Sequence, residues 1–236
     1  MRLDRFLSDT GTATRTESAK AVRAGQVTVN GTRPKSASLH IDPEKDVVVF
    51  QGRTVVYRQF TYLMLNKPDG YLSATEDSRD PTVLDLLPTE LRRLNLFPCG
   101  RLDKNTLGFL LLTNDGDLAH KLLSPRYHVE KTYRYRCEVP LSAEDASRLE
   151  SGVDIGDCVT KPAKVRRETD DTGTITVTEG KFHQIKRMFE AVDNKIIGLE
   201  RVSFGGLALD PTLARGEFRP LTEAEEAHLR HAAGEQ

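Results

Sequence analysis

Apolar residues at helical spacing mark the start of the chain. Leu3, Phe6 and Leu7 fall at positions i, i+3 and i+4, which predicts a short helix with one buried face. Residues 14–17, Thr-Arg-Thr-Glu, match the capping-box pattern, in which a threonine and a glutamate cap each other's backbone amides. We therefore expect a second helix over about residues 15–24.

The two helices are followed by strand patterns. Residues 27–29 alternate Val-Thr-Val, and residues 46–50 form a largely β-branched apolar run, so we expect both segments in strands. The dipeptide Asn30-Gly31, directly after the first strand, best suits a type I′ hairpin turn.

Beyond residue 60, strand and helix patterns are mixed without strict β-α-β alternation. This mixture predicts an α+β fold in place of a doubly wound sheet. Strands are expected within residues 61–70, 107–113, 131–139 and 174–178, and helices over 81–87, 117–123, 183–192 and after 222.

Length and composition bound the class of protein. The chain has 236 residues, 38% hydrophobic and 29% charged, as is typical of a globular protein with more than one domain. The longest apolar run, about residues 109–112, is far shorter than a membrane-spanning helix requires. Charged residues near the N-terminus occupy the place of a signal peptide's apolar core. We expect a cytoplasmic protein without membrane contact.

Cysteine and histidine positions predict neither a disulfide framework nor a metal site. Cys99, Cys137 and Cys158 are an odd, widely spaced set, which fits reduced thiols. The six histidines lack ligand spacings such as H-E-x-x-H. We therefore expect no structural metal.

Positive charge gathers at the start of the chain. Residues 1–58 hold ten Lys/Arg against six Asp/Glu, a local charge of +4, whereas the whole chain carries −1. A modestly cationic front end on a nearly neutral protein suits contacts with phosphates without tight, indiscriminate binding.

The candidate chemistry begins with one carboxylate. Asp103 lies between Arg101 and Lys104, just before the apolar run 107–113. Nearby positive charge favours the ionised carboxylate, which suits a nucleophile or an electrostatic stabiliser. Taken alone, the segment also fits an aspartate that turns the chain and bonds its own backbone.

Two later segments supply complementary groups. They are Lys131-Thr132-Tyr133 and residues 179–189, EGKFHQIKRMF. Together with residues 97–106, they resemble the motifs of the pseudouridine synthases of the RsuA family. This likeness resumes at the Leu-Asn-Lys-Pro-x-Gly of residues 65–70 and runs nearly to the C-terminus. The front end, two helices and then the Gly-x-Val-x-Val-Asn-Gly of residues 25–31, resembles the S4 RNA-binding domain.

These resemblances imply the organisation of the chain. Residues 1–58 would form a small S4 RNA-binding domain, and residues 62–236 a mixed, mainly antiparallel-sheet pseudouridine synthase domain. In S4 modules the two-helix face meets structured RNA, which implies phosphate contacts from Arg2, Arg5, Arg15, Lys20 and Arg23. Each of these cations alone also fits a solvated surface position.

The family resemblance implies the site residues as well. Asp103 would act at the ribose, Tyr133 would stack near the target base as a candidate acid/base, and Lys186 would pair with the aspartate. Three further residues would contact the substrate: Arg101, which helps to hold the vacated space open, Leu199 as an apolar wall, and His183.

Several of these residues have a structural alternative. Tyr133 also fits a core aromatic, and Lys186 fits an exposed pair with Glu190 at i+4. His183 fits a packing residue in a first helical turn, and Arg101 a phosphate clamp or a structural hydrogen bond.

The implied reaction limits the cofactors. Pseudouridine formation breaks the N1–C1′ bond of uridine, rotates the freed uracil and rejoins it through C5, with no atom gained or lost. It needs neither a redox group nor a metal, and the chain has no G-x-G-x-x-G or Walker A motif. We expect no cofactor.

The substrate expectation is a specific uridine in 16S ribosomal RNA, free or in a partly assembled small subunit, and a monomeric enzyme. Within the family that the chain resembles, its short length and the lack of a long basic C-terminal tail are most similar to the small-subunit enzyme, which implies the 16S target. A family member acting on 23S rRNA is the alternative. A non-catalytic S4-type ribosome-binding factor would explain the first domain alone. A glycosidase using Asp103 would need a second acid, for which Glu179 and Asp115 are nominal candidates.

Overall fold

The computed structural model describes residues 1–235, which form two compact units. The first unit contains Met1–Thr61 and Leu87–Leu96, and the second contains Tyr62–Leu86 and the chain from Phe97 onward. The division expected from the sequence, 1–58 and 62–236, assigns residues 87–96 to the second domain instead.

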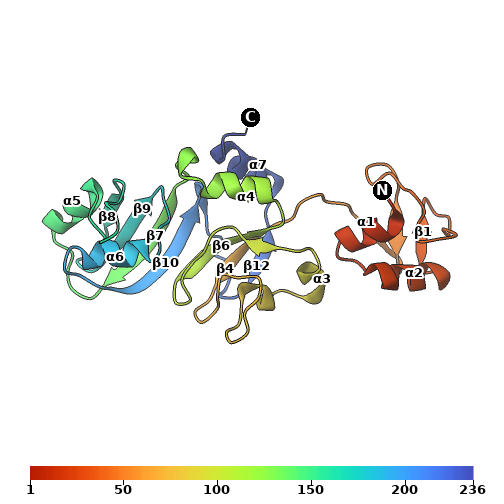
Figure 1. Cartoon of the computed structure of the whole chain (residues 1–236), viewed down its shortest axis with the longest axis horizontal. Helices are drawn as coiled ribbons and strands as arrows, with labels where there is room; N and C mark the ends of the chain where they lie inside the picture. Colours follow the sequence, from red (N-terminus) through yellow and green to blue (C-terminus); the bar gives the residue numbers. More distant parts are fainter. Residues whose placement is uncertain (236) are drawn as a thin grey trace. The chain divides into compact units, whose positions relative to one another are not determined.

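In the first unit, the two N-terminal helices pack against a small sheet (Figure 1). Its strands pair antiparallel in the order β1-β2-β3. The elements are α1 (Leu3–Asp9), α2 (Arg15–Arg23), β1 (Val27–Val29), β2 (Val48–Phe50), β3 (Arg53–Val55) and, in the second segment, α3 (Thr89–Arg92).

Local sequence signals account for both N-terminal helices. Leu3, Phe6 and Leu7 are at most 1% exposed and lie in the core of this unit. The Thr14 side chain accepts from the Glu17 backbone at 3.2 Å, while the Glu17 carboxylate accepts from the Thr14 backbone at 2.7 Å. The predicted capping box and both helices are thus confirmed.

The turn predicted after β1 forms, but it does not decide the strand pairing. Asn30 and Gly31 have φ of 51° and 76°, as a type I′ turn requires, but the turn closes only one bridge, between Val29 and Thr32. β1 pairs instead with β2, beyond the intervening loop. Asn30 holds that loop, because its amide oxygen accepts from the Val47 backbone at 2.9 Å.

The second unit contains a nine-stranded, mainly antiparallel sheet, so the predicted α+β class is confirmed. The strand order is β12-β4-β6-β10-β7-β9-β8, with β5 on β6 and β11 on β10, and only β10 and β6 run parallel. The strands are β4 (Tyr62–Lys67), β5 (Phe97–Pro98), β6 (Leu107–Thr113), β7 (Lys131–Cys137), β8 (Lys164–Arg167), β9 (Thr172–Val177), β10 (Ile196–Phe204), β11 (Leu207–Ala208) and β12 (Phe218–Pro220).

Helices pack on this sheet and on one another. α4 and α7 lie side by side (Figure 1), and α6 packs on the sheet, where Phe189 meets Tyr135 with ring centroids 4.9 Å apart. The helices are η1 (Val83–Leu86, a 3₁₀ turn), α4 (Gly116–Leu123), η2 (Pro125–Tyr127, also 3₁₀), α5 (Ala143–Ser151), α6 (Gln184–Glu190) and α7 (Glu223–Ala232). No helix within residues 1–235 is long and apolar enough to cross a membrane.

Two helix expectations need correction. The segment expected as an amphipathic helix over 81–87 forms only the short 3₁₀ turn η1. The helix expected from His183 to Val192 begins at Gln184, because His183 has a left-handed backbone with φ of 50° and precedes the helix as its cap residue.

Candidate active site

Asp103 lies in the segment that joins β5 to β6. These strands pair antiparallel, so the chain must reverse between them. The Thr106 backbone N–H donates to the Asp103 carbonyl at 3.0 Å and closes the turn. The Asp103 side chain remains 25% exposed, which leaves its carboxylate accessible to a substrate.

Helix α6 brings a cation to this carboxylate. Lys186 Nζ donates to Asp103 Oδ2 at 2.6 Å and to Asn105 Oδ1 at 2.8 Å. His183 Nε2 lies 3.5 Å from Asp103 Oδ1. Lys186 thus lies at one oxygen of the Asp103 carboxylate and His183 lies near the other. Asn105 orients the lysine, and sequence reasoning did not single it out.

The cations beside Asp103 are not those expected from its neighbours in sequence. Lys104 donates to Asp80 at 2.7 Å, and Arg101 is exposed. Lys186 also bonds Asp103 instead of the alternative partner Glu190. The charge environment of the carboxylate is therefore supplied by a segment distant in sequence, which local reasoning cannot identify.

Lys67, the last residue of β4, is fully buried and was not assigned a role from the sequence. Its ammonium donates to the carbonyls of Pro68, Lys104 and Thr106 at 2.9 to 3.1 Å, two of which belong to the Asp103 turn. Burial lowers the pKa of Lys67 to about 8, despite the attraction of Asp69 and, less, of Asp103. The signal for Lys67 in the sequence was a lysine at the end of a segment that forms a buried strand.

Tyr133 and Leu199 lie on the sheet face that α6 covers. Tyr133 and Tyr135 alternate on β7, so both point to the face where Tyr135 meets Phe189 of α6. Leu199 lies opposite Tyr135 in the register and shares that face. Both predicted residues are buried, and the Tyr133 hydroxyl makes no hydrogen bond to another residue in the described range 1–235.

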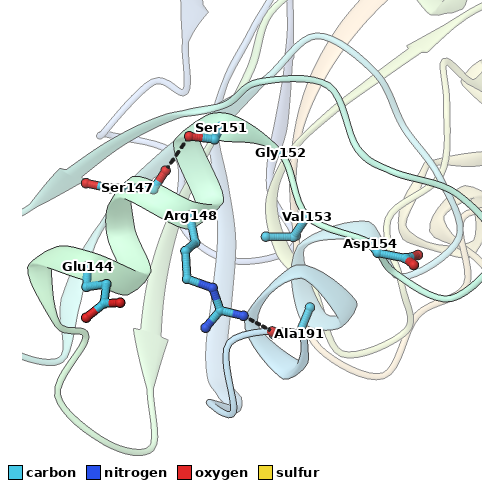
Figure 2. A pocket seen from close by; sticks show the side chains of 8 residues that line it. All are labelled: Glu144, Ser147, Arg148, Ser151, Gly152, Val153, Asp154 and Ala191. Carbon is cyan, nitrogen blue, oxygen red and sulfur yellow. Dashed lines mark hydrogen bonds between the residues drawn. The ribbon is translucent and has the colours of Figure 1, made fainter.

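In the part of the chain that the structure describes, neither a metal site nor the surface hollow at α5 belongs to this arrangement. No group of three or more His, Cys, Asp or Glu side chains within residues 1–235 is placed to hold a metal ion. A surface hollow lies at α5, where Arg148 donates to the Ala191 carbonyl at 2.9 Å (Figure 2). None of the predicted site residues lines it.

In the first unit, the five predicted RNA-binding cations are all exposed. Arg2 pairs with Asp4 at 2.6 Å and Arg5 with Asp9 at 3.2 Å. The other three form no ion pair with any residue in the described range 1–235; they are Arg15, Lys20 and Arg23.

Comparison with known proteins identifies the family. Residues 1–48 match the S4 domain, and residues 61–191 match the RNA pseudouridylate synthase family. The chain belongs to the RNA pseudouridine synthases. It is accordingly an isomerase that acts on uridine in RNA.

Relatives of this pseudouridine synthase match it over nearly its whole length. It is 53% identical to RNA pseudouridine synthase YtzG of Bacillus subtilis (strain 168), covering 97% of this chain and 98% of that one. It is 40% identical to ribosomal small subunit pseudouridine synthase A of Escherichia coli (strain K12), covering 97% and 100%. The RsuA-family resemblance is thereby confirmed.

A solved structure supports the same assignment. The crystal structure of a pseudouridylate synthase, 37% identical in sequence, matches with a TM-score of 0.69 over 97% of this chain and 99% of the other. The predicted order, an S4 domain followed by a synthase domain, is therefore confirmed together with the fold class.

Proposed function

We propose that this pseudouridine synthase isomerises a specific uridine of 16S rRNA, with Asp103 as the carboxylate that acts at the ribose. The observation that carries the chemical part is the 2.6 Å contact between Lys186 and Asp103, made across the second unit beside an accessible turn. The 16S part is supported by relatives named as small-subunit enzymes.

A single paired carboxylate suits this chemistry. Cleavage of the N1–C1′ bond develops positive charge on the ribose, which an anionic Asp103 stabilises or attacks. Uracil carries negative charge as it leaves, so no second, protonated carboxylic acid is required as in ordinary glycoside hydrolysis. Lys186 donates to both Asp103 and Asn105, and these two bonds fix the position of the Asp103 carboxylate. Effective catalysis requires such a fixed geometry.

The remaining predicted residues retain the detached base. Tyr133 offers a flat ring and a free hydroxyl on the face below α6, and Leu199 offers an apolar wall on the same face. Arg101, exposed on the Asp103 turn, is proposed to help hold open the space vacated when the uridine leaves its stack.

The first unit is proposed to position the enzyme on folded RNA. Its five exposed cations supply phosphate contacts, which fix orientation without reading sequence. We further propose that the enzyme acts as a cytoplasmic monomer and that the substrate is 16S rRNA, free or within a partly assembled small subunit.

Chemical mapping of pseudouridine tests the proposal. The purified protein is incubated separately with 16S transcript, with small-subunit assembly intermediates and with 23S transcript. We expect one new pseudouridine in 16S rRNA, in one or both forms of that substrate. Modification of 23S rRNA alone would overturn the target, and release of free uracil would indicate hydrolysis.

A further inference from the structure

Phe182 is a large aromatic side chain that remains in water. It lies in the segment before α6 and is 74% exposed. Single exposed apolar residues are common on protein surfaces, so exposure alone assigns no role. The contacts of its ring and its place beside the catalytic helix are more informative.

The Phe182 ring is stacked on the imidazole of His183. The ring centroids are 3.8 Å apart and the planes differ by 19°. One face of the phenyl ring is therefore covered by a second flat ring, while its large exposed fraction leaves surface for another partner.

The segment that carries this pair is held at both ends. The Gln184 side chain accepts from the Lys181 backbone at 3.0 Å and donates to the buried Glu179 carboxylate at 2.8 Å. The Arg187 side chain donates to the Phe182 carbonyl at 3.2 Å. The aromatic pair is thus pre-ordered before any ligand arrives, which lowers the entropic cost of binding.

The stack leads directly to the candidate catalytic carboxylate. His183, whose ring carries Phe182, places Nε2 3.5 Å from Asp103 Oδ1. His183 therefore lies between Asp103 and the exposed Phe182 ring, and Arg101 is exposed on the turn of the same aspartate.

We propose that Phe182 and His183 form a stacking platform for an unpaired nucleobase next to the target uridine in RNA. When a uridine leaves its stack, a neighbouring base loses a stacking partner. Aromatic side chains replace such partners in many RNA complexes, and they do so for any base because every base has a π-face. This inference rests on the proposed role of Asp103.

The substitution Phe182→Leu tests the platform. Leucine keeps an apolar side chain but removes the flat ring, and the exposed position carries little risk of misfolding. On RNA that the wild type modifies, we expect KM to rise roughly tenfold, within the range for one stacked base, while kcat stays within about twofold. Phe182→Tyr should restore the wild-type KM.

A control and a direct probe accompany this test. Ile197→Ala truncates another exposed apolar side chain of the second unit and should leave KM unchanged. In an RNA fragment with 2-aminopurine beside the mapped target, fluorescence should be quenched by the wild type and by Phe182→Tyr, and much less by Phe182→Leu.

The outcomes separate this inference from the proposed function. A wild-type KM in Phe182→Leu, an equal defect in Phe182→Tyr, or a fall in kcat alone would overturn the platform. Measuring RNA affinity of Phe182→Leu in an Asp103→Asn background gives the same comparison without turnover. Turnover retained by Asp103→Asn would instead overturn the role of Asp103, whatever Phe182 does.

Discussion

Carboxylate–cation pairs differ between the two units. In α1 of the first unit, Arg5 and Asp9 are four residues apart, with side chains 63% and 38% exposed. At the candidate active site, Lys186 and Asp103 are 83 residues apart, with side chains 22% and 25% exposed. The pair in the first unit thus joins neighbouring residues in solvent, whereas the pair at the candidate active site joins distant segments and is partly shielded from solvent.

This difference separates two uses of charge. An exposed pair is screened by water and salt and constrains little beyond its own helix. A partly buried pair interacts more strongly and fixes two segments of the chain together. We infer that the first unit uses cations for adjustable RNA affinity, whereas the second uses one cation to orient a reacting group.

The substitution Lys186→Met should have the largest effect, because it removes the long-range pair. We expect the single-turnover rate constant to fall on the order of 100-fold, as is typical when a reacting group is misplaced. Lys186→Arg should recover part of the rate. The matched control Lys104→Met removes the exposed partner of Asp80 and should cost far less. Equal effects of the two methionine variants would contradict the distinction.

Removing charges from the first unit should change affinity and not chemistry. In Arg15→Gln/Lys20→Gln/Arg23→Gln, we expect RNA affinity to fall about tenfold and the slope of log K against log salt to drop by about 2, with kcat unchanged. Arg2→Gln/Arg5→Gln should do less per residue, because Asp4 and Asp9 already neutralise those cations. Filter binding at several salt concentrations measures both, and a lower kcat with an unchanged slope would refute this division.

Lys131 offers a contrast to Lys186, because it is buried and, within the described residues 1–235, its ammonium has only the Val129 carbonyl as hydrogen-bond acceptor. Burial, then repulsion from Arg201, lowers the pKa of Lys131 from 10.5 to about 8. Between these values the unfolded chain holds a proton that the folded protein has lost, so stability from this residue rises with pH.

Comparison with Lys131→Met isolates this pH dependence. Relative to that variant, the wild type's free energy of unfolding should rise through pH 8 to 10.5, by at most about 1.4 kcal/mol per pH unit. Urea unfolding of both proteins at several pH values measures it. A difference between the two that stays constant across this window would show that Lys131 titrates normally.

The smallest expected effect is on the local capping contact. Thr14→Ala removes the side chain that caps α2 and should lower the free energy of unfolding of the first unit by about 1 kcal/mol. Thr16→Ala, at an exposed position that does not cap the helix, is the control. Urea unfolding followed by circular dichroism compares them, and equal losses would show that the cap contributes nothing specific.

The elements predicted from sequence were those set by local chemistry. The capping box of α2 and the alternation of β7 are written in a few neighbouring residues, and both appear in the structure. The Asn30-Gly31 dipeptide shows the limit, because its local turn forms while the strand pairing is decided by a more distant segment.

The candidate site was predictable only in part for the same reason. Family motifs drew attention to Asp103 and Lys186, and the structure brings these two side chains into contact. The buried Lys67 and the orienting Asn105 were not predicted, because their bonds to the Asp103 turn and to Lys186 join side chains and carbonyls that come together only in the fold. The sequence predicts that Arg101 and Lys104 supply positive charge at Asp103, whereas in the structure Lys186 pairs with Asp103 and Lys104 pairs with Asp80.

In the proposed mechanism, the carboxylate of Asp103 carries out the isomerisation while other parts of the chain bind RNA. The most direct measurement is pseudouridine yield per enzyme, together with RNA affinity, for Asp103→Asn. We expect no detectable pseudouridine and an affinity within about threefold of wild type. Appreciable pseudouridine formed by this variant would show that Asp103 is not the catalytic carboxylate.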